Sequence, residues 1–217
     1  MTKQPKPSHP AGSPPAPLTG RQTERRTRIL AASAQLARHG GFEAVQMREV
    51  AETSNVALGT LYRYFPSKIH LLVATMQDQL QQLHSTLHAR PLSTPEPAAR
   101  VCETLLRAFR SLQHEPQLAD AMVRALTFAN RSAGDEVEKV SCLTTTIILE
   151  AMGLESPPTA RQLSAVRVIA HTWHSTLITW LSGRASLEEV RTDIETACEL
   201  VEMTAATRSG WSSSTAQ

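Results

Sequence analysis

Long apolar runs are missing from this 217-residue sequence, and no stretch approaches the roughly 18 uninterrupted apolar residues that a membrane span needs. The first twenty residues contain six prolines and no apolar segment of the kind found in a signal peptide. Cysteine is scarce, since the three thiols of Cys102, Cys142 and Cys198 are odd in number and far apart. Without an export signal, such thiols are more often reduced than paired in disulfides. We therefore expect a soluble, cytoplasmic protein that has no membrane partner.

The sequence also lacks the short motifs that mark common enzyme sites. It contains no nucleophile elbow, no Walker loop, no Rossmann glycine run and no His-Glu-x-x-His segment. Two histidine pairs, His84 with His88 and His171 with His174, have spacings that could hold zinc, but neither pair has an obvious third ligand nearby. Exposed or packed histidines are the simpler interpretation. We therefore expect no catalysis, no metal and no other cofactor.

Strand patterns are missing as well, because apolar residues recur at intervals of three and four, which is typical of helices. The β-branched run 144–148 falls inside such a helical period. Breaks at glycine and proline, the first of them at Gly40-Gly41, divide the pattern into separate helices. The sequence thus predicts an all-α protein with nine helices, at about residues 21–39, 47–54, 58–65, 68–89, 96–114, 116–130, 134–152, 159–182 and 186–207.

The two ends of the chain differ in composition from the rest. Residues 1–20 are rich in proline and residues 208–217 are rich in serine, and we expect both segments to be disordered. Residues 1–70 contain ten basic and four acidic side chains, a net charge of +6, so residues 71–217 must carry −4 to give the total of +2. A basic head on an acidic body suits a protein that presents one end to phosphates, although chance surface charge could also produce it.

The predicted helices 47–54 and 58–65 are short and are joined by only three residues. Two such helices form a helix-turn-helix, which places its second helix in the major groove of DNA. Within that second helix, Leu61 and Phe65 are four residues apart and should pack inward on Leu36, Phe42 and Val50. Polar, aromatic and basic side chains are then left facing solvent or DNA, at Thr60, Tyr62, Arg63 and Tyr64.

The run from Gly59 to Phe65, Gly-Thr-Leu-Tyr-Arg-Tyr-Phe, is followed by Lys68 and resembles the DNA-binding signature of TetR-type repressors. That resemblance implies a nine-helix fold with a DNA-binding domain at 21–67, a connecting helix with a ligand-binding and dimerisation body at 68–207, and no enzymatic activity. Glycine at 59 also allows close approach of the backbone to a phosphate. By resemblance the residues expected to contact DNA are Gln46, Arg48, Ala57, Leu58, Gly59, Thr60, Tyr62, Arg63, Tyr64 and Lys68.

Roles within this set differ. Gln46, Tyr62, Tyr64 and Lys68 match phosphate-contacting positions of the family. Ala57, Leu58, Thr60 and Arg63 match positions near bases, which specify sequence where phosphate contacts only fix register. The plainer alternative for either tyrosine is that it is a packed aromatic. Four arginines early in the first helix could contact phosphate or form a solvated basic face, namely Arg21, Arg25, Arg26 and Arg28.

The last two predicted helices carry an apolar stripe. The resemblance implies that they pair with a second copy of the chain, so that a homodimer reads a palindromic operator in double-stranded DNA. Plain core packing within one chain is the alternative. The residues expected at the dimer interface are Trp173, Leu177, Trp180, Leu181, Ala197 and Val201.

The same resemblance implies an effector cavity within the body. Segments 40–48, 56–73, 118–125 and 180–186 further resemble those TetR-type regulators that repress sterol catabolism, which implies an apolar acyl effector such as a sterol-derived coenzyme A thioester. A regulator of efflux or fatty-acid metabolism is an alternative, and a ligand-free architectural DNA-binding protein or a helical enzyme are alternatives of other classes. The residues expected to line the cavity are Met76, Leu80, Leu83, Leu105, Phe109, Met122, Val123, Leu126, Thr127, Trp173 and Leu177.

Overall fold

The computed structural model describes residues 19–89 and 94–206, and within these ranges the chain forms nine α-helices, one short 3-10 helix and no strand. This confirms the predicted all-α fold. In the described ranges no helix is both long enough and apolar enough to cross a membrane. The expected disordered segments 1–20 and 208–217 lie outside the described residues, apart from Thr19 and Gly20. The helices are α1 Gly20–Ala44, α2 Met47–Thr53, α3 Leu58–Tyr64, α4 Lys68–Ala89, α5 Pro97–His114, α6 Pro116–Phe128, η1 Arg131–Ala133, α7 Gly134–Met152, α8 Ala160–Leu181 and α9 Leu187–Ala206.

Local sequence signals explain where these helices begin and end. At the start of α8 the Thr159 hydroxyl accepts from the Gln162 backbone N–H at 3.2 Å, and the Gln162 side chain accepts from the Thr159 N–H at 2.8 Å, which forms a capping box. Proline occupies the first position of α5 and of α6, where its missing N–H costs nothing. The predicted break after residue 39 is a backbone kink, because Gly41 has φ +64° and the helical turn after it ends at Ala44.

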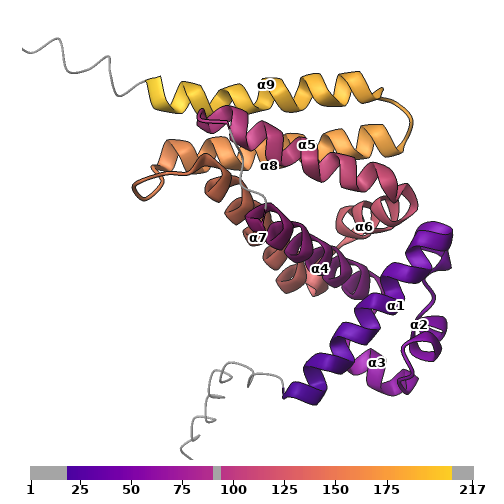
Figure 1. Cartoon of the computed structure of the whole chain (residues 1–217). Helices are drawn as coiled ribbons and strands as arrows, with labels where there is room; N and C mark the ends of the chain where they lie inside the picture. Colours follow the sequence, from indigo (N-terminus) through magenta and orange to yellow (C-terminus); the bar gives the residue numbers. More distant parts are fainter. Residues whose placement is uncertain (1–18, 90–93, 207–217) are drawn as a thin grey trace, which may run out of the picture.

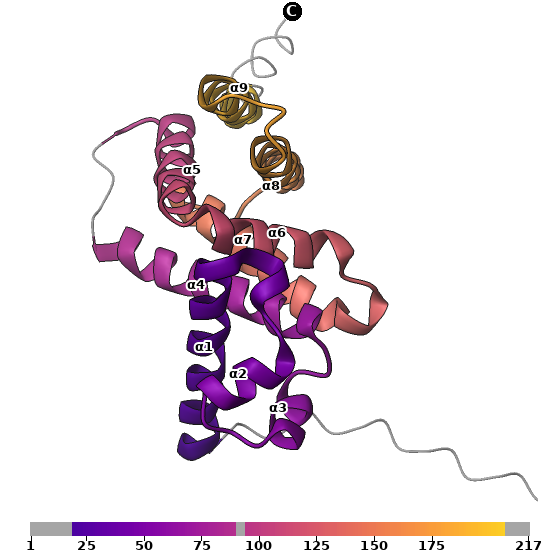
Figure 2. The same ribbon diagram turned by 90° about the vertical axis from the view of Figure 1, so that its right-hand side faces the viewer.

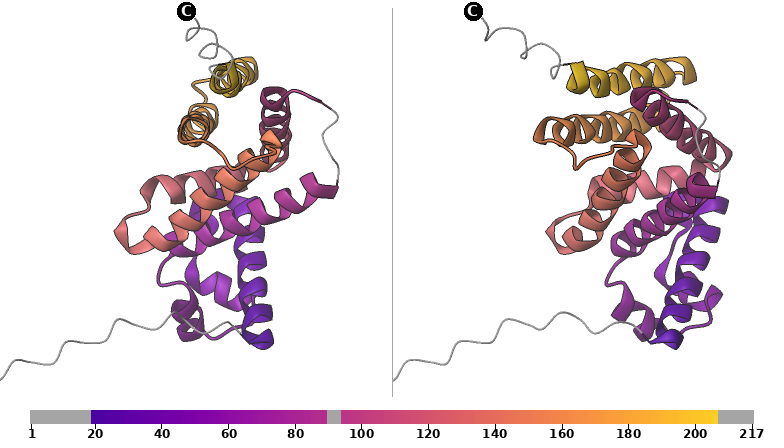
Figure 3. Two further views of the ribbon diagram at one scale, coloured as in Figure 1. Left: turned by 90° about the vertical axis from the view of Figure 1, so that its left-hand side faces the viewer. Right: turned by 60° about the vertical axis from the view of Figure 1, so that its left-hand side comes forward.

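The molecule is elongated, and its helices are distributed between two opposite ends (Figure 1). Helices α1, α2 and α3 form a head at one end, and α8 and α9 lie side by side as a hairpin at the opposite end. Helix α4 leaves the head and runs into the body, where it packs against α6 and α7 (Figures 2 and 3). A movement of α4 relative to the body would therefore move the head.

Two hydrophobic cores occupy this frame. One joins the head to α4 and α6, because buried Leu30, Leu61 and Leu72 share a cluster with Leu118 and Met122 of α6. The other lies among α5, α7, α8 and α9 and also includes Val123 of α6. Packing is therefore continuous across the predicted domain boundary at 67/68, and α6 contributes to both cores.

The junction between α1 and α6 is reinforced by charged side chains. Arg38 pairs with Glu115 at 2.9 Å, and Arg124 of α6 pairs with Glu43 at 3.1 Å. The Arg124 guanidinium also lies 4.7 Å from the centre of the Phe42 ring. Both pairs are partly exposed, so each contributes little to stability, and both link α1 to α6 or to the residue before it.

Candidate DNA-binding surface and effector cavity

The second helix of the helix-turn-helix, α3, divides its side chains between core and solvent. Leu61 and Phe65 are 0% and 3% exposed and belong to the core that contains Val50, with Leu36 and Phe42 packed against it. This confirms the predicted inward face. Tyr62 is 46% exposed and Arg63 is also exposed, so these two side chains extend from the opposite face, where a nucleic acid could meet them.

Tyr64 is held differently from Tyr62. Its hydroxyl donates to the backbone oxygen of Gln22 in α1 at 3.4 Å, and its ring lies 6.3 Å from that of Phe65. Tyr64 is half-buried, and so is Thr60. The packed-aromatic interpretation therefore fits Tyr64 better than it fits Tyr62.

The backbone of α3 is open to solvent at its N-terminal end. A Cβ placed on Gly59 would meet no atom of the protein within 4 Å, so the fold itself does not require glycine there. Ala57 beside it is exposed, and so are Arg48 and Gln46 at the start of α2. The Gln46 side-chain amide donates to the Glu43 backbone oxygen at 2.8 Å. These residues leave the N-terminal turn of α3 accessible to a close-fitting partner.

Two predicted DNA-contacting regions are also tied to the aromatic core of the head. The Lys68 ammonium lies 4.0 Å from the centre of the Phe42 ring, and the Arg26 guanidinium lies 5.7 Å from the centre of the Phe65 ring. Partial burial lowers the pKa of Lys68 from its ordinary value; Glu43 opposes this shift and Arg124 adds to it. Lys68 is thus positioned by a cation–π contact at the first residue of α4.

The body contains two cavities that border the same four side chains, Met76, Leu80, Trp173 and Leu177. One, of about 610 Å³, lies among α4, α5, α6 and α8 and is also lined by Leu83, Met122 and Val123. The other, of about 800 Å³, lies among α4, α6, α7 and α8 and is also lined by Leu126. Eight of the eleven residues predicted to line a cavity therefore do so.

Three of the predicted cavity residues do not line either space. Leu105 and Phe109 are buried in the core of the body, where Phe109 packs edge-on against Trp180 at 4.9 Å. The Thr127 hydroxyl donates to the Val123 backbone oxygen at 2.8 Å, within its own helix. Helical spacing identifies a buried face but not the element that covers it, so a role of these three residues in ligand binding stays a prediction.

Polar side chains that were not predicted to line a cavity also border these two spaces. The smaller cavity includes Arg107 and Arg110, with Arg107 paired to Glu103 at 2.5 Å. The larger one includes His171 and His174, and burial followed by the nearby His171 lowers the pKa of His174. Both cavities thus combine an apolar wall with cationic or titratable groups. Only a search of polar positions on the cavity-lining helices could have found them.

Most of the apolar residues predicted to form the dimer interface are buried within the chain itself. Trp173, Leu177, Ala197 and Val201 are between 1% and 9% exposed and belong to the core of the body, so they cannot supply an outer surface. Trp180 and Leu181 are half-buried and pack against the same core. Contacts within the chain account for this burial, since α5 packs on α9 and the Phe109 ring of α5 lies 6.5 Å from the ring of Trp173. Exposed apolar side chains on these two helices are instead Val168, Leu187 and Met203.

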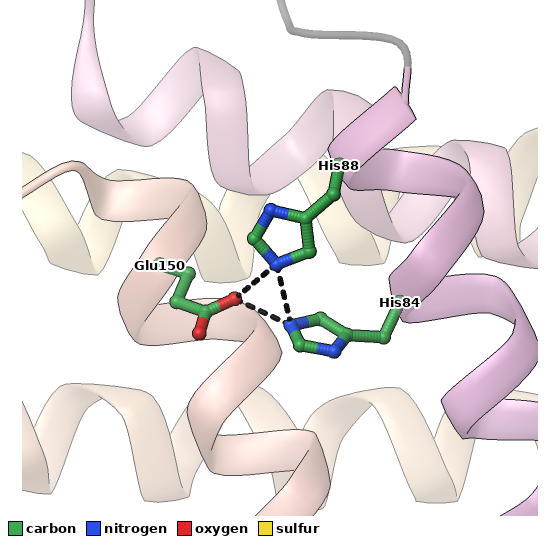
Figure 4. A group of neighbouring side chains, drawn as sticks. All are labelled: His84, His88 and Glu150. Atoms are coloured by element: carbon green, nitrogen blue, oxygen red, sulfur yellow. Dashed lines mark hydrogen bonds and ion pairs between the residues drawn. The ribbon is translucent and has the colours of Figure 1, made fainter.

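One further group of side chains could hold a metal. His84 and His88 of α4 converge on Glu150 of α7 (Figure 4). The His84 Nε2 lies 2.5 Å from the Glu150 Oε2, and the His88 Nε2 lies 3.1 Å from the same oxygen. Hydrogen bonding from His84 is the largest cause of a lowered pKa at Glu150. The interpretation that the histidine pair lacks a third candidate ligand is therefore wrong.

Comparison with known proteins agrees with this arrangement. The family model "Bacterial regulatory proteins, tetR family" matches residues 29–75, and "Tetracyclin repressor-like, C-terminal domain" matches residues 95–201. The chain belongs to the TetR family of bacterial transcriptional regulators, and it is a DNA-binding repressor rather than an enzyme.

Within the family the chain is similar to the HTH-type transcriptional repressor KstR of Rhodococcus jostii (strain RHA1), with 43% identity over 83% of this chain and 84% of that protein. A crystal structure of a TetR transcriptional regulator from Rhodococcus sp. RHA1 is 38% identical, covers 83% of this chain and 97% of that one, and superimposes with a TM-score of 0.78. FadR of Thermus thermophilus in complex with lauroyl-CoA shares the fold, with a TM-score of 0.65 at 19% identity over 82% of this chain and 93% of that one.

Proposed function

We propose that this repressor binds a palindromic operator as a homodimer and is released by an apolar acyl effector, with a sterol-derived coenzyme A thioester as the favoured class. The observation that carries the proposal is the position of α4. Its first residue, Lys68, lies on the head, and its middle residues Met76 and Leu80 border both cavities of the body. A ligand in the body therefore touches the helix that positions the head.

The DNA-contacting set that we propose is the one predicted from sequence. Exposed Arg63 is the best placed to read a base edge, since a bidentate contact to guanine specifies sequence. Lys68 is proposed to contact a DNA phosphate and so to help fix the register of the protein on the duplex. We expect Arg63→Ala to weaken operator binding by about 1–3 kcal/mol and to relax the sequence preference of the protein. We expect Lys68→Ala to weaken binding to all DNA sequences alike, and to reduce the slope of log affinity against log salt concentration by about one.

Titrations on operator and scrambled DNA at several salt concentrations measure both effects. If Arg63→Ala lowered the two affinities equally, Arg63 would be a phosphate contact and the base-reading role would be rejected. Lys139→Ala on α7 is a matched control, because it removes an exposed cation that belongs neither to the proposed DNA-contacting set nor to the outer faces of α8 and α9.

The dimer is proposed to form through the outer faces of α8 and α9. Exposed Val168, Leu187 and Met203 lie on these helices at the end opposite the head. Two-fold pairing there leaves both heads free to meet successive major grooves, about 34–36 Å apart. Light scattering of Val168→Glu should show a monomer that binds the operator weakly. A Val168→Glu protein that stays dimeric would place the interface elsewhere.

The effector class rests on the shape and chemistry of the two cavities. They share Met76, Leu80, Trp173 and Leu177 as lining residues, so an apolar ligand can contact this common wall from either space, and Arg107 and Arg110 at the smaller cavity suit an anionic tail. The similarity to KstR favours a sterol-derived acyl group. A fatty-acyl effector is the second candidate, because FadR of Thermus thermophilus shares this fold and was crystallised with lauroyl-CoA.

Release from DNA requires that the effector bind the free form better than the operator-bound form. Leu118 and Met122 of α6 line the smaller cavity and also belong to the core shared with the head, so α6 acts beside α4. A hundredfold loss of DNA affinity needs about 2.7 kcal/mol of differential binding. Mobility shifts with sterol-derived and with medium-chain fatty acyl thioesters decide between the classes. Release by the fatty acyl compounds alone would select the second candidate, and release by neither would reject both.

A further inference from the structure

We propose that His84, His88 and Glu150 form a binding site for a divalent transition metal, with Zn²⁺ as the preferred ion, and that the ion clamps the C-terminal half of α4 to α7. None of its three ligands lines either proposed effector cavity, although the space around the site shares Leu87 with the smaller one. It is also remote from the proposed DNA-binding surface, because His84 and His88 lie near the end of α4 that is farthest from Lys68.

The three ligand atoms already lie close to the positions that a zinc ion would require. His84 and His88 are four residues apart on α4 and present their Nε2 atoms to one point, which is how paired histidines on a helix bind zinc. The two Nε2 atoms are 3.0 Å apart, and the Glu150 oxygen lies 2.5 and 3.1 Å from them. Tetrahedral bonds of about 2.0–2.1 Å separate ligand atoms by about 3.3 Å. Shifts of a few tenths of an ångström at most positions would open the triangle around an ion.

Hydrogen bonding alone does not account for this triangle. If both imidazoles donate from Nε2 to the carboxylate, their two N–H groups face each other at 3.0 Å and neither accepts. If one Nε2 carries no hydrogen, its lone pair faces a carboxylate oxygen instead. In either case one of the three contacts brings together two hydrogen-bond donors or two acceptors, which repel each other. A cation at the centre accepts all three lone pairs at once, and two neutral imidazoles with one carboxylate are a donor set that zinc uses.

The surroundings leave room to complete the coordination. The three side chains line a cavity of about 260 Å³ together with Thr104, a buried residue that is only 2% exposed. Among the described residues, the Thr104 hydroxyl has no hydrogen-bond partner. A water or other small oxygen ligand on the ion could enter this cavity and meet that hydroxyl. The guanidinium of Arg100 also lines the cavity, but it donates to the backbone oxygens of Ala151 and Met152 at 2.8 and 2.5 Å, which directs it to the end of α7.

A metal at this position would join two elements that are otherwise linked by packing. Glu150 lies 66 residues beyond His84 in the chain, so the ion would close a long loop between α4 and α7. His88 and Glu150 are 61% and 45% exposed, so an ion can reach them from solvent. We therefore expect the clamp to reduce local opening of α4 near its C-terminal end and of α7 near Glu150.

The test uses the full chain, freed of metal with a chelator and titrated with ZnCl₂ against a chromophoric competitor, in a Cys142→Ser background because that exposed thiol could bind zinc on its own. We expect one ion per chain and a higher melting temperature. Co²⁺ in place of Zn²⁺ should give the visible absorption of a four-coordinate site. His84→Ala and Glu150→Gln should each weaken binding at least about tenfold, the smallest effect usual for changes around a metal site.

The matched control is the double variant His171→Ala, His174→Ala, which removes a histidine pair from α8 and should leave zinc binding unchanged. Circular dichroism shows whether each variant is folded. If His84→Ala does not fold, His88→Ala takes its place in the test. Hydrogen exchange with and without ZnCl₂ should slow near residues 84–88 and 147–152. If the His84, His88 and Glu150 variants bound zinc as tightly as the protein with all three residues intact, the proposed site would be rejected. Slowing confined to other helices would overturn the clamp.

Discussion

Leu61 and Phe65 hold α3 against the head, and their burial decides which of its other side chains can meet DNA. Because α3 has only seven residues, two inward anchors four positions apart leave one outward face. Tyr62 and Arg63 lie on that face, while Tyr64 is drawn toward α1 by its contact with Gln22. At the scale of single residues, exposure therefore separates two tyrosines that look equivalent in the sequence.

Gly59→Ala should separate DNA binding from folding. A Cβ at this position meets nothing in the protein, and alanine favours helix over glycine by up to about 1 kcal/mol, so stability should be unchanged or slightly higher. If the backbone there approaches a phosphate, the added methyl should lower operator affinity roughly tenfold, or about 1.4 kcal/mol. Urea denaturation and fluorescence anisotropy measure the two quantities.

Gly134→Ala is the control for that substitution. This glycine at the start of α7 is exposed and also has open space around its Cβ position, but it belongs to the body. The control protein should bind the operator as the unmodified chain does. Unchanged operator affinity in the Gly59→Ala protein would show that no phosphate comes close to this turn.

His174 should make the protein less stable in mild acid. Its pKa in the folded chain is lowered from 6.5, mainly by burial and then by His171, so the folded state binds fewer protons than the unfolded state near that pH. The associated stability is present above pH 6.5 and is lost as the pH falls through the folded pKa. The free energy of unfolding should therefore fall between about pH 7.5 and about pH 5.5, and less so in His174→Asn.

Urea denaturation of both proteins at the two pH values gives the difference. His171→Asn is the companion variant, since it removes the second cause of the shift while leaving the burial of His174 in place. An identical pH dependence in the original chain and in His174→Asn would mean that other groups account for the acid sensitivity.

Among the helices, α6 has the most connected position. It packs on α1 of the head, lines the smaller cavity with Leu118 and Met122, and supplies Val123 to the core of the body. The sequence emphasised α4 as the link between head and body, and α4 is such a link. The junction of α1 with α6 adds a second one, held by the turn at Gly41 and the pair of Arg38 with Glu115.

Gly41→Ala should weaken this junction. Gly41 has φ +64° and ψ −155°, a conformation nearly confined to glycine that costs another residue about 1–3 kcal/mol, and an added Cβ would be in ordinary contact with the Gln117 backbone oxygen of α6 at 3.8 Å. We expect a loss of stability of that size in urea denaturation. Gly20→Ala, at an open position of α1 without positive φ, should change stability by much less. Equal stability of the two variants would mean that the chain reorganises freely at this turn.

At the scale of the whole molecule, the two cavities lie between the elements that hold the head and the hairpin of α8 and α9. Met76 and Leu80 of α4 line both cavities, and so do Trp173 and Leu177 of α8. An effector that occupied both spaces would press on α4 from one side and on α8 from the other. The proposed sensing and dimer functions therefore share α8.

Leu80→Trp should produce a repressor that no longer responds to its effector. The larger side chain would fill the boundary between the cavities while leaving α3 and Lys68 unchanged, so operator binding should persist. We expect at least a tenfold higher effector concentration for release, since a blocked contact of about 1.4 kcal/mol has that effect. Leu80→Ala widens the same point and should keep the response. A normal response in Leu80→Trp would place the effector elsewhere.

The sequence by itself determined the helices and the family. Capping residues, prolines at helix starts and the kink at Gly41 act within a few residues of their own positions, so the ends of most helices could be predicted to within one or two residues. The signature around Gly59 to Phe65 is equally local, because a seven-residue helix must present its outward side chains as a unit. These features need no knowledge of distant segments.

Only the tertiary structure decided what covers each apolar stripe and which distant polar groups meet. Trp173 and Leu177 satisfy the pattern of an interface, but the core of their own chain buries them, because periodicity records that a face is covered and not by what. Glu150 reaches His84 and His88 only because α7 packs beside α4, across more than sixty residues of chain. Contacts of that range depend on how helices pack against each other, and no local pattern encodes them.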